Sequence, residues 1–121
     1  MYAVVCDASD LNGAVVKNSI VGIRSHVDTG CILEETVLMG ADFWQGHPQD
    51  PAVLRPELPP MGIGKGTRIR KAIIDKNARI GSGVELMNRA GVEEADGDSW
   101  FIRDGIIVIP KGAVIPDGTV V

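Results

Sequence analysis

Residues 62–86 read G-I-G-K-G-T-R-I-R-K-A-I-I-D-K-N-A-R-I-G-S-G-V-E-L, and this stretch decides the fold of the chain. Its aliphatic residues recur in steps of six, five, six and six positions, at Ile63, Ile69, Ile74, Ile80 and Leu86. This spacing matches neither the alternation of a half-buried strand nor the period of a helix. Hexapeptide spacing is typical of a parallel β-helix, in which each aliphatic side chain points inward from a short strand and small residues form the corners. The stretch therefore predicts an all-β solenoid.

Two further segments repeat the pattern. Residues 16–33, V-K-N-S-I-V-G-I-R-S-H-V-D-T-G-C-I-L, match residues 69–86 at an offset of 53 and share the irregular five-residue step. A third copy, I-P-K-G-A-V-I-P-D-G-T-V, occupies residues 109–120. Because the copies share both the period and its irregularity, chance is a poor explanation. We expect one domain over residues 1–121, with about 18 residues in each three-sided coil.

The composition agrees with a solenoid. Of the 121 residues, 45% are hydrophobic but only 4% are aromatic, and a solenoid stacks aliphatic side chains in ladders that need few rings. The net charge of −4 argues against a nucleic-acid partner. We see neither an apolar run of the roughly 20 residues that a membrane helix needs nor a secretory signal. Cys6 and Cys31 lack the spacing of a metal site, and Cys31 aligns with Val84 at an inward position, which predicts a buried thiol in a reducing compartment.

Three segments interrupt the repeat. Residues 1–13 predict an incomplete coil or a cap, because the open end of a solenoid exposes unpaired strand edges. Residues 40–61 hold five of the seven prolines and predict a loop excursion, with a helical turn at 51–58. Residues 87–104 predict a second, acidic loop excursion, with a turn at Asp96–Gly97 and a strand that starts near Trp100.

Each excursion carries an adjacent aromatic pair, at residues 43–44 and 100–101. We expect Phe43, Trp44, Trp100 and Phe101 to pack the excursions onto the flank of the solenoid. Contacts between subunits, or a platform for sugars, are the alternatives for the same side chains.

Three segments of this sequence resemble one enzyme family. They are G-A-D-F-W-Q at residues 40–45, G-I-G-K-G-T-R-I-R-K-A-I-I-D-K-N-A-R-I-G at 62–81, and F-I-R-D-G-I with I-P-K-G-A-V-I-P-D-G within 101–118. They resemble the C-terminal left-handed β-helix domain of ADP-glucose pyrophosphorylase (glucose-1-phosphate adenylyltransferase), most closely its plant and cyanobacterial branch. The resemblance covers residues 16–121, and the string at residues 72–81 is its most specific part. The left hand of the helix is implied by the resemblance alone.

The resemblance implies a regulatory and oligomerisation role. Enzymes of this family make ADP-glucose and pyrophosphate from ATP and glucose 1-phosphate, for starch or glycogen synthesis. Nothing in the sequence resembles their nucleotidyltransferase domain, so we expect this chain to be inactive alone and to hold no cofactor, with Mg²⁺ needed only by that catalytic domain. The implied partners are a nucleotidyltransferase domain or further subunits in a homo-oligomer. The implied compartment is the bacterial cytoplasm or, in a plant or alga, the plastid stroma.

The resemblance also implies a site for phosphorylated effectors such as 3-phosphoglycerate, and for phosphate. Carried onto this sequence, its residues are Lys76 and Lys111, with Asp75 orienting a lysine. Arg70 is a weaker candidate, placed by its proximity in the sequence alone. Two ammonium groups on adjacent coils could flank one phosphate. Pro110 departs from the family pattern, which more often has an aliphatic or polar residue there. The alternative is an ordinary solvated charged face.

Two other functions stay open for a hexapeptide solenoid. A free-standing acyltransferase of this type uses a histidine base at a trimer interface, and His26 lies in a repeat whereas His47 lies in the proline-rich segment. A three-histidine zinc site cannot form within one chain that has two histidines. A purely structural solenoid is the other alternative.

Overall fold

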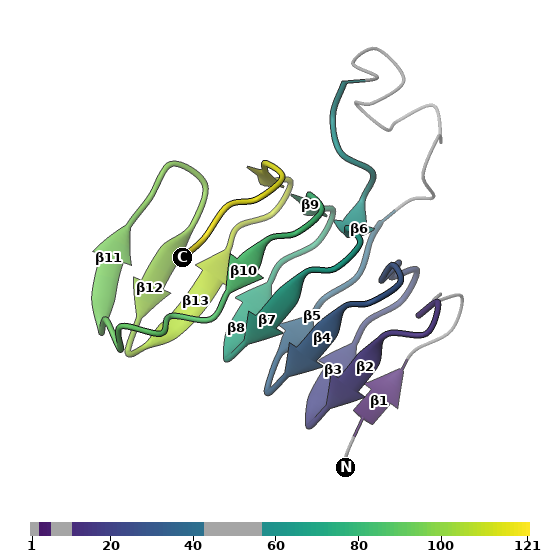
Figure 1. Ribbon diagram of the computed structural model, residues 1–121, viewed down its shortest axis with the longest axis horizontal. Helices are drawn as coiled ribbons and strands as arrows, with labels where there is room; N and C mark the ends of the chain where they lie inside the picture. The colour runs from purple at the N-terminus through teal and green to yellow at the C-terminus, as the bar shows by residue number, and fades with distance from the viewer. Residues whose placement is uncertain (1–2, 6–10, 43–56) are drawn as a thin grey trace.

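The strands of this protein form three sheets around one core (Figure 1). The structure is a computed structural model that describes residues 3–5, 11–42 and 57–121. The largest sheet has the order β1 (Ala3–Val5), β3 (Ser19–Val21), β5 (Val37–Leu38), β8 (Ala72–Ile74), β13 (Ile106–Ile109), β12 (Phe101–Arg103), β11 (Glu94–Asp96). The second sheet is β10 (Glu85–Leu86), β7 (Arg68–Arg70), β4 (Ile32–Glu34), β2 (Val15–Lys17), and the third is β14 (Val114–Ile115), β9 (Arg79–Ile80), β6 (Gly62–Ile63). Every ladder between coils is parallel, which confirms the predicted solenoid.

Strand register confirms the repeats seen in the sequence. Val16 pairs with Leu33, Leu33 with Ile69, and Ile69 with Leu86, so the inward aliphatic side chains stack from coil to coil. A regular coil, such as the one from Ile69 to Leu86, advances by 17 residues rather than the 18 expected. Each regular coil is one residue shorter than three full hexapeptides because it contains one five-residue side.

A left-handed residue makes the five-residue side possible. Asn18, Glu35 and Lys71 stand at equivalent corners with φ angles of 48°, 48° and 52°. This conformation turns the chain sharply, although it costs a non-glycine residue roughly 1–2 kcal/mol. Behind the first corner the buried Ser19 hydroxyl donates to the carbonyl of Lys17 at 2.7 Å, so the tight turn leaves its polar groups paired.

The core is a stack of aliphatic side chains along the solenoid axis. Each fully buried Leu, Ile or Val stabilises the fold by roughly 1.5–3 kcal/mol relative to an exposed one. Cys31 lies among them at 1% exposure, as predicted, and its thiol contacts the carbonyl oxygen of Gly64 at 2.9 Å. Burial raises the pKa of Cys31, which keeps it in the thiol form. The largest fully buried side chains are Leu33, Ile63, Ile69, Ile74, Ile80, Leu86, Ile107, Ile109, Ile115, Val21, Val27 and Val84.

The second excursion, expected as a loop, contains the antiparallel hairpin of β11 and β12, which widens the largest sheet beyond β13. Asp104 and Gly105 connect β12 to β13 with φ angles of 52° and 76°, as in the two-residue hairpin turn that an Asp-Gly pair favours. The turn predicted at Asp96–Gly97 lies at the end of β11, where the Gly97 amide donates to the carbonyl of Trp100 at 2.8 Å.

Trp100 packs against the core, which confirms the packing predicted for this aromatic residue. Its indole lies against Gly97, where a Cβ would collide with the ring. The partly buried Phe101 contacts the guanidinium of Arg103 at 5.5 Å from its ring centroid. The expectations for Cys6, Phe43, Trp44 and His47, and most of the expected turn at 51–58, fall outside the described residues.

Candidate anion-binding site

The two lysines singled out in the sequence lie on stacked turns of one corner of the solenoid. Lys76 follows β8 and Lys111 follows β13, and these two strands are paired in the largest sheet. The amide of Gly112 donates to the carbonyl of Lys76 at 2.9 Å, and the amide of Asn77 donates to the carbonyl of Gly40 at 3.1 Å. Asn77 and Gly112 have φ angles of 63° and 71°, so both turns have the same shape and place their lysines in register.

The lysine side chains converge on a carboxylate from a third turn of the same corner. The Lys76 Nζ lies 3.3 Å from the Asp42 Oδ1, and the Lys111 Nζ lies 3.2 Å from the Asp42 Oδ2. Asn77 completes the group, because its Nδ2 donates to the Asp42 Oδ2 at 3.2 Å and its Oδ1 accepts from the Asp42 amide at 2.8 Å. We call Asp42, Lys76, Asn77 and Lys111 the lysine corner.

The electrostatics of the lysine corner favour a bound negative charge. Hydrogen bonds from Lys111, Asn77 and Lys76, in that order, lower the pKa of Asp42 below its ordinary value. The side chains of Lys76, Lys111 and Asp42 are 42%, 60% and 39% exposed, so the corner is open to solvent and to small ions. The corner thus holds one negative charge, the Asp42 carboxylate, between two ammonium groups.

Asp75 positions the turn. Its Oδ1 accepts from the backbone amide of Lys76 at 2.7 Å, and its own amide donates to the carbonyl of Ile109 at 2.9 Å. The carboxylate thus fixes the backbone from which the Lys76 side chain extends.

Comparison with known proteins identifies the family. Residues 1–120 match the model of a protein family described as the GLGC left-handed parallel beta-helix domain. The chain belongs to the β-helix domain family of glucose-1-phosphate adenylyltransferase. The small subunit of glucose-1-phosphate adenylyltransferase from Zea mays is 45% identical over 125 residues, which cover 97% of this chain and all of that relative. The family match is also the basis for the left hand of this β-helix domain. The strand spacing alone does not predict it, because ordinary parallel crossovers are right-handed in about 98% of cases.

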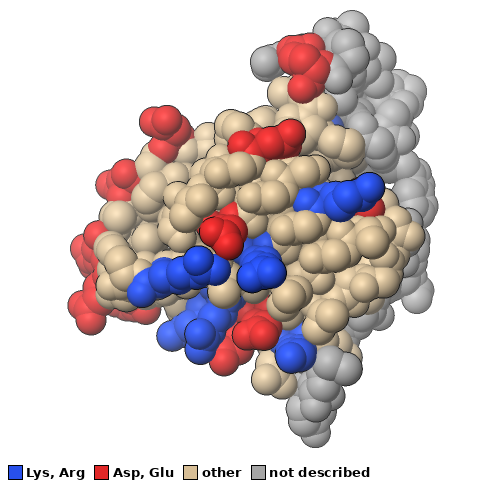
Figure 2. Space-filling view, in the orientation of Figure 1, with Lys and Arg blue, Asp and Glu red and all other residues tan. Residues whose placement is uncertain are grey.

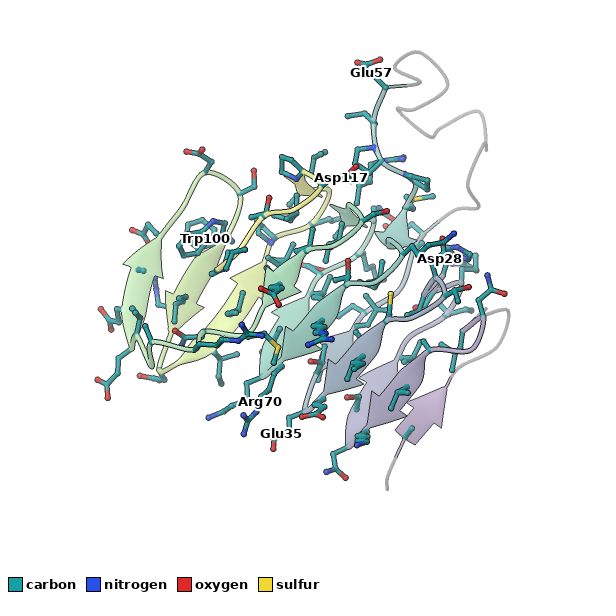
Figure 3. All side chains as sticks on the ribbon, in the orientation of Figure 1. Asp28, Glu35, Glu57, Arg70, Trp100 and Asp117 are labelled. Atoms are coloured by element: carbon teal, nitrogen blue, oxygen red, sulfur yellow. The ribbon has the colours of Figure 1, made fainter. Side chains whose placement is uncertain are left out.

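Arg70 lies at a different corner of the β-helix domain. It ends β7, beside Lys71, and both line a cavity of about 370 Å³ together with Glu93 and Asp104. Figure 3 places Arg70 at the lower edge of the molecule next to Glu35, and Figure 2 shows basic and acidic side chains intermixed along that edge. The structure therefore does not bring Arg70 together with Lys76 and Lys111.

Three residues of this region were missed by the sequence analysis as site residues. Asp42 was noticed only within the family segment at 40–45, and Asn77 only as part of a motif, although asparagine is enriched at left-handed positions. Arg79 was given no role, yet it is 3% exposed and its Nη1 donates to the carbonyl of Pro59 at 3.0 Å. Arg79 thus holds the chain where it returns from the first excursion.

His26 lies in a confined setting. It is half-buried, and its carbonyl oxygen accepts from the Ile63 amide at 2.8 Å. A Cβ added to Gly62 would lie 3.2 Å from the His26 Cβ. The cavity beside His26 has a volume of about 10 Å³, which is room for about one water molecule.

Two kinds of feature are absent from the described ranges, 3–5, 11–42 and 57–121. No group of three or more His, Cys, Asp or Glu side chains there is placed to hold a metal ion. No helix in the same ranges is long and apolar enough to cross a membrane.

Proposed function

We propose that this β-helix domain binds phosphorylated effectors at the lysine corner and joins the subunits of a glucose-1-phosphate adenylyltransferase. The observation that carries the proposal is the convergence of Lys76 and Lys111, from adjacent coils, on one carboxylate at 3.3 and 3.2 Å. Phosphate oxygens accept charge-assisted hydrogen bonds from ammonium groups as carboxylate oxygens do. A corner that already binds an internal anion is suited to bind an external one.

The chemistry favours a small phosphorylated acid or inorganic phosphate as the ligand. Lysine acts on phosphate as a mobile point charge, and each ammonium group offers three donors. The amide of Asn77, which donates to the carboxylate at 3.2 Å, would be a third donor to the same oxygens. Catalysis and its Mg²⁺ belong, in this proposal, to a nucleotidyltransferase domain, so the β-helix domain alone forms no ADP-glucose.

An apolar row on the largest sheet supports the assembly role. Ile20, Val37 and Ile73 are in register on β3, β5 and β8, point outward, and are 48%, 36% and 39% exposed. Exposed aliphatic side chains in a continuous row are typical of a contact surface. We propose that this row packs against a further subunit or the nucleotidyltransferase domain, in the cytoplasm or the plastid stroma.

Calorimetric titration of the chain with 3-phosphoglycerate and with inorganic phosphate tests the effector site. We expect saturable binding to the wild-type chain and its loss in the double variant Lys76→Ala, Lys111→Ala. Lys17→Ala is the matched control, because Lys17 is an exposed lysine on β2, at another corner. Binding that survives the double variant, or that Lys17→Ala abolishes equally, would place the site elsewhere.

A further inference from the structure

The lysine corner is already occupied by a group of this chain. The carboxylate of Asp42 accepts from both ammonium groups and from the Asn77 amide, which are the same donors that an external anion would use. An anion and the Asp42 carboxylate therefore compete for one position. This competition has a direct consequence for affinity and selectivity.

The backbone around Asp42 is held independently of its carboxylate. The amide of Ala41 donates to the carbonyl of Ile23 at 3.0 Å, and the Arg24 Nε donates to the carbonyl of Ala41 at 3.0 Å. The amide of Asp42 itself is bonded to the Asn77 Oδ1 at 2.8 Å. The half-exposed carboxylate can thus leave the lysines by rotation of its side chain, without any change in the fold.

We propose that Asp42 is a built-in competitor, which weakens the binding of external anions at the lysine corner and selects dianions over monoanions. This inference rests on the proposed effector site. With Asp42 in place, a monoanion would only replace one negative charge by another between the two lysines. A phosphate dianion neutralises both lysines, so the exchange is favourable for a dianion alone.

The substitution Asp42→Asn tests the proposal, because it removes the charge and keeps the size and the backbone amide. Inorganic phosphate at pH 8, as the dianion, and acetate, as the monoanion, are titrated into wild-type and variant chains. We expect phosphate to bind the variant roughly three- to tenfold more tightly, since two exposed ion pairs no longer have to be broken. Acetate binding is expected to become measurable only in the variant.

Asp96→Asn is the matched control, because Asp96 is also exposed and ion-paired, with Arg103 at 2.8 Å, but lies on β11. It should leave phosphate affinity unchanged, and thermal unfolding should verify that both variants are folded. Unchanged or weaker phosphate binding in Asp42→Asn would overturn the competitor role while leaving the effector site intact. Saturable binding in neither the wild type nor the variant would overturn both proposals together.

Discussion

Two glycines show how closely neighbouring coils approach one another at single residues. Gly62 has a φ of 103°, and a Cβ there would collide with the carbonyl oxygen of His26 in the neighbouring coil. Gly66 has a φ of 72°, but no atom of another coil lies within 4 Å of the position that a Cβ would take there. Both glycines are in the left-handed region, yet only Gly62 is also required by packing.

Gly62→Ala is expected to destabilise the domain by at least about 3 kcal/mol, because backbone strain and a steric collision add. Gly66→Ala should cost only about 1 kcal/mol, the strain alone. Urea unfolding monitored by circular dichroism measures both free energies. Equal losses would mean that the coils can move apart at Gly62.

The ionisation of Asp42 provides a second prediction for single residues. Its lowered pKa means that the ion pairs stabilise the fold above about pH 3.8 and that this contribution is lost as pH falls through the still lower folded pKa. Carbon-13 NMR of the carboxyl group should show the Asp42 pKa rising in Lys111→Ala, and rising less in Lys76→Ala, because Lys111 is the larger cause. A larger rise in Lys76→Ala would reverse the assigned order.

The two lysines could be named from the sequence because a family motif carries them, whereas their partner could not. Asp42 lies 34 positions before Lys76, and the two meet because β5 and β8, which precede them, are paired in neighbouring coils. The first excursion, between Leu33 and Ile69, lengthens the separation in sequence. No local pattern encodes a contact across such a separation. The burial of Arg79 was missed for the same reason, since its partner Pro59 precedes it by 20 positions.

Among the elements, the hairpin of β11 and β12 departs most from the solenoid. The strand period was read correctly for the coils, but residues 87–104 have no hexapeptide spacing, so a loop was expected. The turn expected at Asp96–Gly97 and the strand expected near Trp100 are parts of this hairpin, whereas the Asp104–Gly105 pair signals the following turn, from β12 to β13, and was not used. Glu94 and Asp96 on the outer strand make this edge unfavourable for pairing with another chain.

Trp100→Ala tests how the hairpin is held. Because Trp100 is partly buried and packs on the core, we expect a loss of about 2 kcal/mol, below the range for fully buried tryptophans. Hydrogen exchange should become fast in β11 and β12 while the amides of β7 and β8 stay protected. Loss of protection throughout the coils would show that the hairpin folds as one unit with them.

At the scale of the whole molecule, the coils stack on their neighbours, and the apolar row of Ile20, Val37 and Ile73 is exposed on the outside of the stack. Ile73→Lys places a charge in the middle of the apolar row and should lower the molar mass measured by light scattering. Val15→Lys is the matched control, since Val15 is 42% exposed but lies on the second sheet. An unchanged mass in Ile73→Lys would remove the apolar row as the contact surface.

The turn that carries the lysine corner also closes the first excursion. Asn77 holds the outgoing chain at Asp42, and Arg79 holds the returning chain at Pro59, so residues two positions apart fasten both ends. Closing a loop costs little more when the loop is longer, roughly 0.6 kcal/mol for each doubling of its length. Evolution can therefore lengthen, shorten or rewrite the intervening sequence without shifting the register of the coils, which makes this corner the natural place for the domain to acquire new specificity.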